Sequence, residues 1–285
     1  MNTVCLFPGQ GSQSKGMGAA LFDRYADWRA EADDILGYSV RELCVDDPRG
    51  ELGLTQFTQP ALYVVNALTW RARLEDGGAV PDVVAGHSLG EYNALLAANV
   101  FDFGTGLRMV KQRGELMGRV RGGGMAAVIG MEPERIEAVL ADSEPGRQLD
   151  VANFNSFDQT VIAGPTDAIS AVKAQFEAAG VRAFIPLKVS APFHSRYMQA
   201  PMEEFSSFLD QFTFSAPSIP VVANVTGRLY EADAVKPTLA RQIGSAVRWL
   251  DSMNWLLDEG VTTFDEVGPG SVLAKLVVQI RKRRG

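Results

Sequence analysis

The stretch Val83-Val84-Ala85-Gly86-His87-Ser88-Leu89-Gly90 decides the fold of this 285-residue chain. Its first three residues form a short apolar run typical of a buried strand, and the alanine- and leucine-rich residues 88–98 that follow have helical character. Two glycines, Gly86 and Gly90, allow a sharp turn between strand and helix. A strand, a tight turn and a helix in this order predict an α/β fold with a parallel sheet core.

Two other segments repeat this arrangement. Residues 4–7 form a predicted buried strand, and the glycine-rich loop Pro8-Gly9-Gln10-Gly11-Ser12 follows it. Near the C-terminus, a strand predicted over residues 263–267 leads into Gly268-Pro269-Gly270 and a helix over residues 271–280. Open α/β sheets bind ligands at the ends of their strands, so these loops mark a predicted binding region.

The middle of the chain has a different pattern. After Gly122-Gly123-Gly124, strands and helices are predicted in the order β-α-β-β-α-β, which is the ferredoxin-like motif. The strands are expected at residues 125–129, 149–153, 159–164 and 182–187, and the helices at residues 133–141 and 166–179. We therefore expect a small ferredoxin-like unit, residues 124–190, inserted into a large α/β-hydrolase-like catalytic unit, residues 1–123 and 191–285, with a cleft between them.

Composition narrows the function classes. The 27 basic and 34 acidic residues give a net charge of −7, which argues against nucleic-acid binding. No apolar run approaches the roughly 20 residues of a membrane helix, and the N-terminus lacks a signal-peptide pattern, so we expect a cytoplasmic protein without membrane contact. Cys5 and Cys44 are expected to stay reduced. Two histidines and two scattered cysteines predict no metal site, and no cofactor is expected. The basic residues 281–284 are expected to be a solvated tail.

Ser88 stands in the pattern Gly-x-Ser-x-Gly of a nucleophile elbow, and the strand before it and the helix after it match the context that this motif requires. Such a turn exposes the serine hydroxyl at a helix N-terminus, where free N–H groups favour developing negative charge. The alternative is a serine that merely caps the helix. The complete context favours the nucleophile.

A nucleophilic serine needs a base, and the chain offers only His87 and His194. His87 adjoins Ser88 in the elbow, so its side chain is expected to point away from the hydroxyl. His194 is therefore the candidate base, against the alternative of a structural loop histidine. No acidic residue stands out as a third member, and a backbone carbonyl is expected to orient the ring instead.

Arg113 lies on the apolar face of a helix predicted over residues 105–117. The stripe at helical spacing consists of Gly106, Met109, Val110, Arg113, Leu116 and Met117. One interpretation is an arginine that reaches the surface or pairs with a structural carboxylate. The other is a guanidinium that holds a substrate carboxylate through two parallel hydrogen bonds. The pattern alone leaves both open.

The loop Phe7-Pro8-Gly9-Gln10-Gly11-Ser12-Gln13 is not a phosphate-binding loop. A dinucleotide fingerprint requires glycine where Ser14 stands, and a P-loop requires lysine where Met17 stands. Its backbone N–H groups are suited to one half of an oxyanion hole, with the N–H of Leu89 as the other half.

These segments together resemble the malonyl-CoA:acyl carrier protein transacylases and the acyltransferases of polyketide synthases, nearly from end to end. Five landmarks occur in the order of that family: residues 7–13, Thr58-Gln59-Pro60-Ala61-Leu62, Gly86-His87-Ser88-Leu89-Gly90-Glu91, Pro192-Phe193-His194-Ser195 and Glu266-Val267-Gly268-Pro269-Gly270. The sequence looks most like the freestanding, trans-acting polyketide acyltransferases.

The resemblance implies an [acyl-carrier-protein] S-malonyltransferase that carries malonyl from malonyl-CoA to the phosphopantetheine thiol of an acyl carrier protein, without a cofactor and as a monomer. Two alternatives stay open: a hydrolase that clears stalled acyl groups from carriers, and a malonyl transacylase of fatty-acid synthesis.

The resemblance also implies individual roles. Ser88 and His194 match the catalytic pair, and Arg113 matches the arginine that binds the substrate carboxylate. The further implied roles are oxyanion-hole amides from Gln10 and Leu89, an acyl-pocket lining from Gln59, orientation of His194 by the carbonyl of Gln242, and a malonyl preference from Phe193. Pro192 departs from the small residue or alanine that the family often has there, so a branched malonyl substrate stays open as an alternative.

Overall fold

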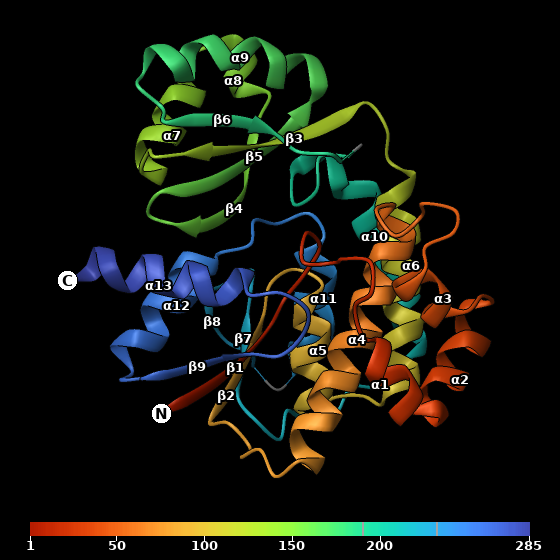
Figure 1. Ribbon diagram of the computed structural model, residues 1–285. Coiled ribbons are helices and arrows are strands. Elements are labelled where there is room, and N and C mark those ends of the chain that lie inside the picture. The colour runs from red at the N-terminus through yellow and green to blue at the C-terminus, as the bar shows by residue number, and fades with distance from the viewer. Residues whose placement is uncertain (190, 232) are drawn as a thin grey trace.

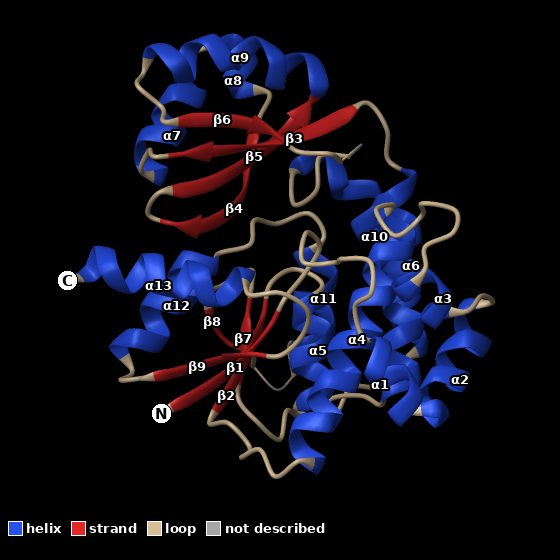
Figure 2. Ribbon diagram, in the orientation of Figure 1, coloured by secondary structure: helices blue, strands red, loops and turns tan. Residues whose placement is uncertain are grey.

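The computed structural model describes residues 1–189, 191–231 and 233–285 and contains two β-sheets (Figures 1 and 2). One sheet has five strands in the order β8-β7-β2-β1-β9, and the other has four strands in the order β4-β5-β3-β6. The two sheets lie in separate parts of the molecule. No helix in the described part of the chain is long and apolar enough to cross a membrane.

The five-stranded sheet forms the core of the larger unit. Its strands are β1 (Thr3–Phe7), β2 (Val83–Gly86), β7 (Val221–Ala223), β8 (Arg228–Leu229) and β9 (Thr263–Glu266). The pairs β1–β2, β1–β9 and β2–β7 are parallel, as the strand-turn-helix repeats predict. The edge strand β8 was not predicted and pairs antiparallel with β7, because the chain reverses at Gly227, whose φ is 65°. The sheet is therefore mixed.

Helices cover both faces of this sheet. They are α1 (Ala19–Arg24), α2 (Ala26–Leu36), α3 (Val40–Val45), α4 (Thr55–Glu75), α5 (Gly90–Ala97), α6 (Phe103–Arg119), α10 (Gln199–Phe208), α11 (Val235–Gln242), α12 (Trp249–Asp258) and α13 (Val272–Arg284), with two short 3-10 helices, η1 (Arg196–Met198) and η2 (Leu209–Gln211). Alternate residues of a strand point to opposite faces. Cys5 and Phe7 accordingly join the core with α4, α5 and α6, whereas Val4 and Leu6 join the core with α12 and α13.

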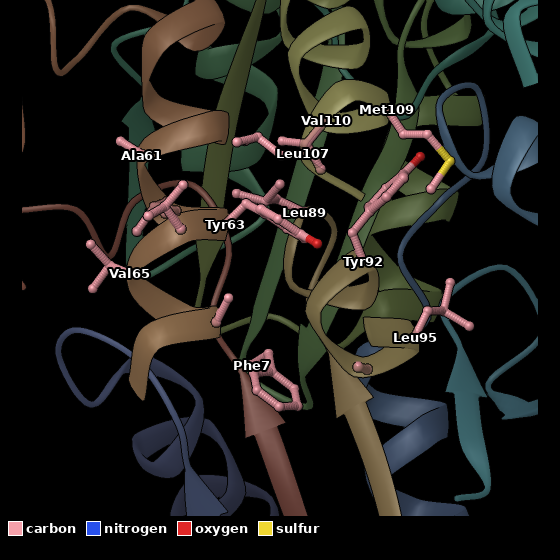
Figure 3. Packing of buried hydrophobic residues seen from close by; sticks show 14 of the residues in the cluster. Phe7, Ala61, Tyr63, Val65, Leu89, Tyr92, Leu95, Leu107, Met109 and Val110 are labelled. Atoms are coloured by element: carbon pink, nitrogen blue, oxygen red, sulfur yellow. The ribbon is translucent and has the colours of Figure 1, made fainter. Parts of the chain in front are cut away.

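The α6 helix carries the predicted apolar stripe. It begins at Phe103, two residues before the predicted start, because the Asp102 side chain accepts a hydrogen bond from the Thr105 amide at 2.7 Å and caps the helix. All six stripe residues are buried. Figure 3 shows how Leu107 and Val110 of α6 lie near Tyr63 of α4 and Leu89 of the elbow. This packing turns the side of α6 that bears Arg113 toward the elbow.

The four-stranded sheet follows the predicted order of elements. Its elements are β3 (Gly123–Ile129), α7 (Pro133–Ala141), α8 (Glu144–Arg147), β4 (Asp150–Ser156), β5 (Gln159–Pro165), α9 (Thr166–Ala178) and β6 (Ala183–Pro186). All its strand pairs are antiparallel. The short α8 was not predicted and is capped by the Ser143 side chain. The three helices cover one face, and the other face turns toward the larger unit (Figure 2). Ser190, at the predicted boundary, lies outside the described residues.

The smaller unit contacts the larger unit through strand β4. Asn153 forms a parallel bridge with Val247, and the main chain of Val247 bonds on both sides, to Ala152 and Phe154, at 2.9 Å. Figure 1 shows α12 and α13 beneath this strand. This bridge holds the smaller unit in place above the strand ends of the larger sheet.

The basic C-terminal residues 281–284 are exposed as predicted, but they are not a loose tail. They continue α13 as far as Arg284. Arg283 pairs with Glu132 at 2.7 Å, and the Arg281 guanidinium lies 4.8 Å from the centroid of the Phe264 ring. The helical pattern extends because these side chains find partners on neighbouring elements.

Gly90 of the elbow and Gly9 of the loop after β1 allow main chains to approach closely. A Cβ atom on Gly90 would lie 1.9 Å from the carbonyl oxygen of Phe7, and one on Gly9 would lie 2.3 Å from the carbonyl oxygen of His87. No side chain fits at either distance. The loop after β1 can therefore lie directly against the elbow.

We expect Gly90→Ala to lower the free energy of unfolding by about 1–3 kcal/mol or more, because the added methyl group overpacks this contact. Urea denaturation followed by circular dichroism measures the change. Gly53→Ala is the matched control, since a Cβ there meets nothing within 4 Å and the backbone is not left-handed. Equal stability of the two variants would contradict the close approach.

Candidate active site

Ser88 sits at the tip of the elbow in a left-handed backbone conformation, with φ of 51°. Groups from two other segments hold its main chain. The Ser88 amide donates to Asn224 Oδ1 at 2.7 Å, and the Ser88 carbonyl accepts from Gln242 Nε2 at 2.8 Å. Asn224 also donates to the Gly86 carbonyl at 2.6 Å. The hydroxyl is therefore held away from a capping position and points into a pocket.

His194 approaches Ser88 from the loop before η1. Its Nε2 lies 2.8 Å from Ser88 Oγ, although the two residues are 106 positions apart. On the other side of the ring, Nδ1 faces the carbonyl oxygens of Gln242 at 2.9 Å and Ser245 at 3.2 Å. Two acceptors require the proton on Nδ1, so Nε2 is free to accept the serine proton. Gln242 is the last residue of α11. Its carbonyl oxygen is therefore one of the last four of the helix, which have no hydrogen-bond partner within the helix.

The electrostatic surroundings keep this imidazole neutral. His194 is only 4% exposed. Burial, and after it the positive charge of Arg113, lowers the pKa of His194 to about 3. The ring is therefore a neutral base at physiological pH.

Arg113 is a fully buried cation beside the serine. Its Nη1 donates to Gln59 Oε1 at 2.7 Å, and its Nη2 donates to Ser88 Oγ at 3.0 Å and to Gln242 Oε1 at 2.9 Å. Its Nε has no hydrogen-bond partner within residues 1–189, 191–231 and 233–285, and no carboxylate in those ranges forms an ion pair with it. Burial lowers the pKa of Arg113. Such a site favours an anion, because a buried charge is costly unless it is paired.

The pocket in front of Ser88 is small, about 100 Å³. It is lined by Gln10, Gln59, His87, Ser88, Leu89, Arg113, Met117, Met125, Asn153, Leu187, Val189, Phe193 and His194. All eight residues predicted for the site lie here except Gln242, which contacts Ser88 and Arg113 from beneath the pocket. The volume suits a short acyl group rather than a long chain.

Two main-chain amides at the pocket are free to bind an oxyanion. Neither the N–H of Gln10 nor that of Leu89 donates to another group in the part of the chain that the structure describes. The loop that carries Gln10 is held by Asn66, whose Nδ2 donates to the Pro8 carbonyl at 2.9 Å. Rigid, unused donors at a reacting centre are the arrangement that stabilises developing negative charge.

His87 turns away from Ser88 Oγ, as expected from its place in the elbow. Its Nε2 lies 2.9 Å from Asn155 Oδ1 of β4, and its ring lies 5.5 Å from that of Trp249. It joins the elbow to the smaller unit. No cluster of three histidine, cysteine, aspartate or glutamate side chains among the described residues could hold a metal ion.

Three polar residues of the site, two of them buried and Tyr230 partly buried, were missed from the sequence. Glu91, Asn224 and Tyr230 form a group beneath the elbow, where the Tyr230 hydroxyl bonds to the Glu91 carboxylate and the Asn224 amide donates to it at 3.2 Å. Burial raises the pKa of Glu91 to about 7. Asn224 directly follows β7, so its place at a strand end was a usable signal. Glu91 resembled an ordinary acid in the first turn of a helix, and no pattern marked Tyr230.

Residues 4–283 match the family model described as acyl transferase domain. The chain belongs to this family. The Bacillus subtilis protein named polyketide biosynthesis malonyl CoA-acyl carrier protein transacylase PksC is 50% identical over 278 residues, which cover 97% of this chain and 96% of PksC. The polyketide biosynthesis protein ThaF of Burkholderia thailandensis is 53% identical over 275 residues, which cover 96% of this chain but only 24% of ThaF.

Solved structures agree with this acyltransferase along its whole length. A malonyl CoA-acyl carrier protein transacylase from Burkholderia pseudomallei superposes with a TM-score of 0.95 at 50% identity, and the match covers 99% of each chain. A malonyl-transacylase determined in complex with its type II PKS acyl-carrier protein gives a TM-score of 0.94 at 37% identity, covering 99% of this chain and 94% of the other.

We expect the ring resonances of His194 to stay unchanged between about pH 8 and about pH 5, because its pKa lies near 3 and the imidazole remains neutral throughout. An exposed histidine, with a pKa of about 6.5, becomes mostly protonated over the same range. NMR of the protein with isotope-labelled histidine measures the titration, and His194→Ala assigns the two rings. A midpoint near pH 6.5 for His194 would contradict the environment described here.

Proposed function

We propose that this acyltransferase moves a malonyl group from malonyl-CoA to the phosphopantetheine thiol of an acyl carrier protein, through an ester on Ser88. The observation that carries the proposal is the buried guanidinium of Arg113, which has no carboxylate partner in the described chain and lies 3.0 Å from Ser88 Oγ. A malonyl group brings the missing carboxylate two bonds from the carbonyl carbon that reacts. The names of PksC and of the transacylase structure from Burkholderia pseudomallei support this substrate.

In the first half-reaction, His194 Nε2 accepts the proton of Ser88 as Oγ attacks the thioester carbonyl carbon. The carbonyl π electrons move onto oxygen, which the amides of Gln10 and Leu89 stabilise; each such donor is worth about 10²–10³ in rate. When the carbonyl reforms, the C–S bond breaks, and the thiolate of coenzyme A takes the proton from Nε2. The products are malonyl-Ser88 and coenzyme A.

The second half-reaction reverses these steps with another thiol. The phosphopantetheine thiol gives its proton to His194 Nε2 and attacks the ester carbonyl. As the C–O bond breaks, Ser88 Oγ recovers the proton from the ring. The products are the malonyl carrier protein and free enzyme, so no proton, metal or electron is consumed over the cycle.

Two further residues define the acyl pocket in this proposal. Gln59 Oε1 accepts from Arg113 Nη1 at 2.7 Å and so fixes the plane of the guanidinium. Phe193 lines the pocket next to His194 and limits its width, which favours an unbranched malonyl group. The carbonyl of Gln242 fixes the tautomer of His194.

We also propose that residues 1–123 and 191–285 form an α/β-hydrolase-like unit and residues 124–190 a ferredoxin-like unit. The strand order β4-β5-β3-β6, with α7 and α9 on one face, supports the second assignment. In this proposal the protein is a cytoplasmic monomer that needs no cofactor.

The service of a polyketide synthase in trans is a further part of the proposal. PksC and ThaF, whose names refer to polyketide biosynthesis, are 50% and 53% identical to this chain, whereas the malonyl CoA-acyl carrier protein transacylase of Escherichia coli is 38% identical.

Transfer is tested by incubating the enzyme with labelled malonyl-CoA and a holo acyl carrier protein. We expect malonyl carrier protein to form in large excess over free malonate, and an intact-mass adduct on Ser88 when the carrier is omitted. Ser88→Ala should lose both the adduct and the transfer, because the attacking oxygen is gone. Free malonate as the main product would indicate a hydrolase, and a covalent adduct in Ser88→Ala would exclude Ser88 as the nucleophile.

Arg113→Ala is expected to lower the ratio of kcat/KM for malonyl-CoA to that for acetyl-CoA by at least about tenfold, since each charge-assisted hydrogen bond to the carboxylate is worth roughly 1.5–3 kcal/mol. Steady-state transfer to one carrier protein with each thioester gives the ratio. Arg119→Ala, on an exposed position of the same helix, is the control and should keep it. An unchanged ratio in Arg113→Ala would remove the basis for a malonyl substrate.

A further inference from the structure

Glu91 is a fully buried carboxylate that the proposed chemistry does not use. It lies in the first turn of α5 and is 0% exposed. The Tyr230 hydroxyl donates to its Oε1, and Gln242 Nε2 at 2.7 Å and the Asn224 amide at 3.2 Å donate to its Oε2. A buried carboxylate with this many donors is a built feature of the site.

The Gln242 side chain links Glu91 to the reacting groups. Its Nε2 donates both to Glu91 Oε2 and to the Ser88 carbonyl, and its Oε1 accepts from Arg113 Nη2 at 2.9 Å. In this orientation of the Gln242 carboxamide, both hydrogens of Nε2 and the oxygen Oε1 have hydrogen-bond partners. Nε2 must face the two acceptors, and Oε1 must face the guanidinium.

This orientation depends on Glu91. A carboxamide can turn by half a rotation and exchange its oxygen and nitrogen, and only its partners decide which orientation is held. Without the Glu91 acceptor, the present orientation is favoured only by the Ser88 carbonyl, which accepts from Nε2, and by Arg113 Nη2, which donates to Oε1. The opposite orientation would place an NH₂ group against Arg113 Nη2, donor against donor, and would push the guanidinium out of its plane.

We propose that Glu91 is a positioning residue that fixes the Gln242 carboxamide and, through it, orients Arg113 toward the substrate carboxylate. The proposal rests on the proposed function, because it assigns Glu91 to the selection of malonyl. Glu91 touches no reacting atom. Its effect should therefore appear in the discrimination between malonyl and acetyl more than in acyl transfer as such.

The test compares Glu91→Ala with Glu91→Gln at about pH 8, above the raised pKa of Glu91. In Glu91→Gln, the amide oxygen can replace Oε2 as the acceptor for Gln242 and Asn224, while its NH₂ faces the Tyr230 hydroxyl oxygen. This variant removes the charge of residue 91 and keeps the orientation of the Gln242 carboxamide. In Glu91→Ala, both the charge and the orientation are lost.

We expect Glu91→Ala to lower the malonyl-to-acetyl ratio of kcat/KM by about tenfold, and Glu91→Gln to keep it within about threefold of the native value. Glu177→Ala, an exposed acid on α9, is the matched control for the loss of a carboxylate. An equal loss toward both thioesters in Glu91→Ala would mean a purely structural role and overturn the proposal. So would a ratio that falls as far in Glu91→Gln as in Glu91→Ala, because charge rather than orientation would then be responsible.

If Glu91→Ala does not fold, Glu91→Asp replaces it. Its carboxylate is withdrawn from Gln242 by one methylene, so the ratio should fall in the same direction, and an unchanged ratio overturns the proposal. Arg113→Ala, measured in parallel, separates the two levels of inference. If Arg113→Ala keeps the native malonyl-to-acetyl ratio of kcat/KM, the malonyl assignment itself fails. If that ratio falls in Arg113→Ala but not in the Glu91 variants, only the role of Glu91 fails.

Discussion

The left-handed backbone of Ser88 is the constraint around which the rest of the site is arranged. A non-glycine residue in this conformation costs about 1–3 kcal/mol, so it persists only where the surroundings hold it. Asn224 holds the amide and Gln242 the carbonyl of Ser88. Gly90 of the elbow and Gly9 of the loop after β1 let that loop lie against the elbow. Strain at one residue thus accounts for polar contacts that come from distant parts of the chain.

The charge of Arg113 acts on two groups at once. Together with burial, it lowers the pKa of His194 and so keeps the imidazole neutral, and it leaves a buried cation in need of an anion. Neutral oxygens of Gln59 and Gln242 and the face of Tyr92, whose centroid lies 5.5 Å away, stabilise the guanidinium without neutralising it. A structural carboxylate in direct contact would have filled the position that the proposed substrate carboxylate takes.

Local pattern was enough to predict the parts of the site that lie in regular elements. The elbow follows from an apolar strand, two glycines and a helix, and the buried place of Arg113 follows from the apolar stripe of α6. The order of elements in the smaller unit was also predictable, because each has its own periodicity. The base required elimination between two histidines, and the carbonyl of Gln242 required resemblance to a known family.

The parts that the sequence did not reveal depend on contacts between remote segments. Glu91 looks like an acid that favours a helix N-terminus, and only the positions of Asn224, Tyr230 and Gln242 make it part of the site. The edge strand β8 has two residues and no pattern of its own. The C-terminal arginines looked like a charged tail because their partners, such as Glu132, are far away in sequence.

The two carbonyl oxygens at Nδ1 of His194 have a consequence for the lifetime of the imidazolium ion. Carbonyl dipoles stabilise that ion less than a carboxylate would, and the guanidinium nearby repels it. In the proposed mechanism the protonated ring is therefore a strong acid, which releases its proton to the departing sulfur as charge develops there. In the proposed exchange both thiols meet the same base, and the concentrations of the two thioesters and the two thiols together set its direction.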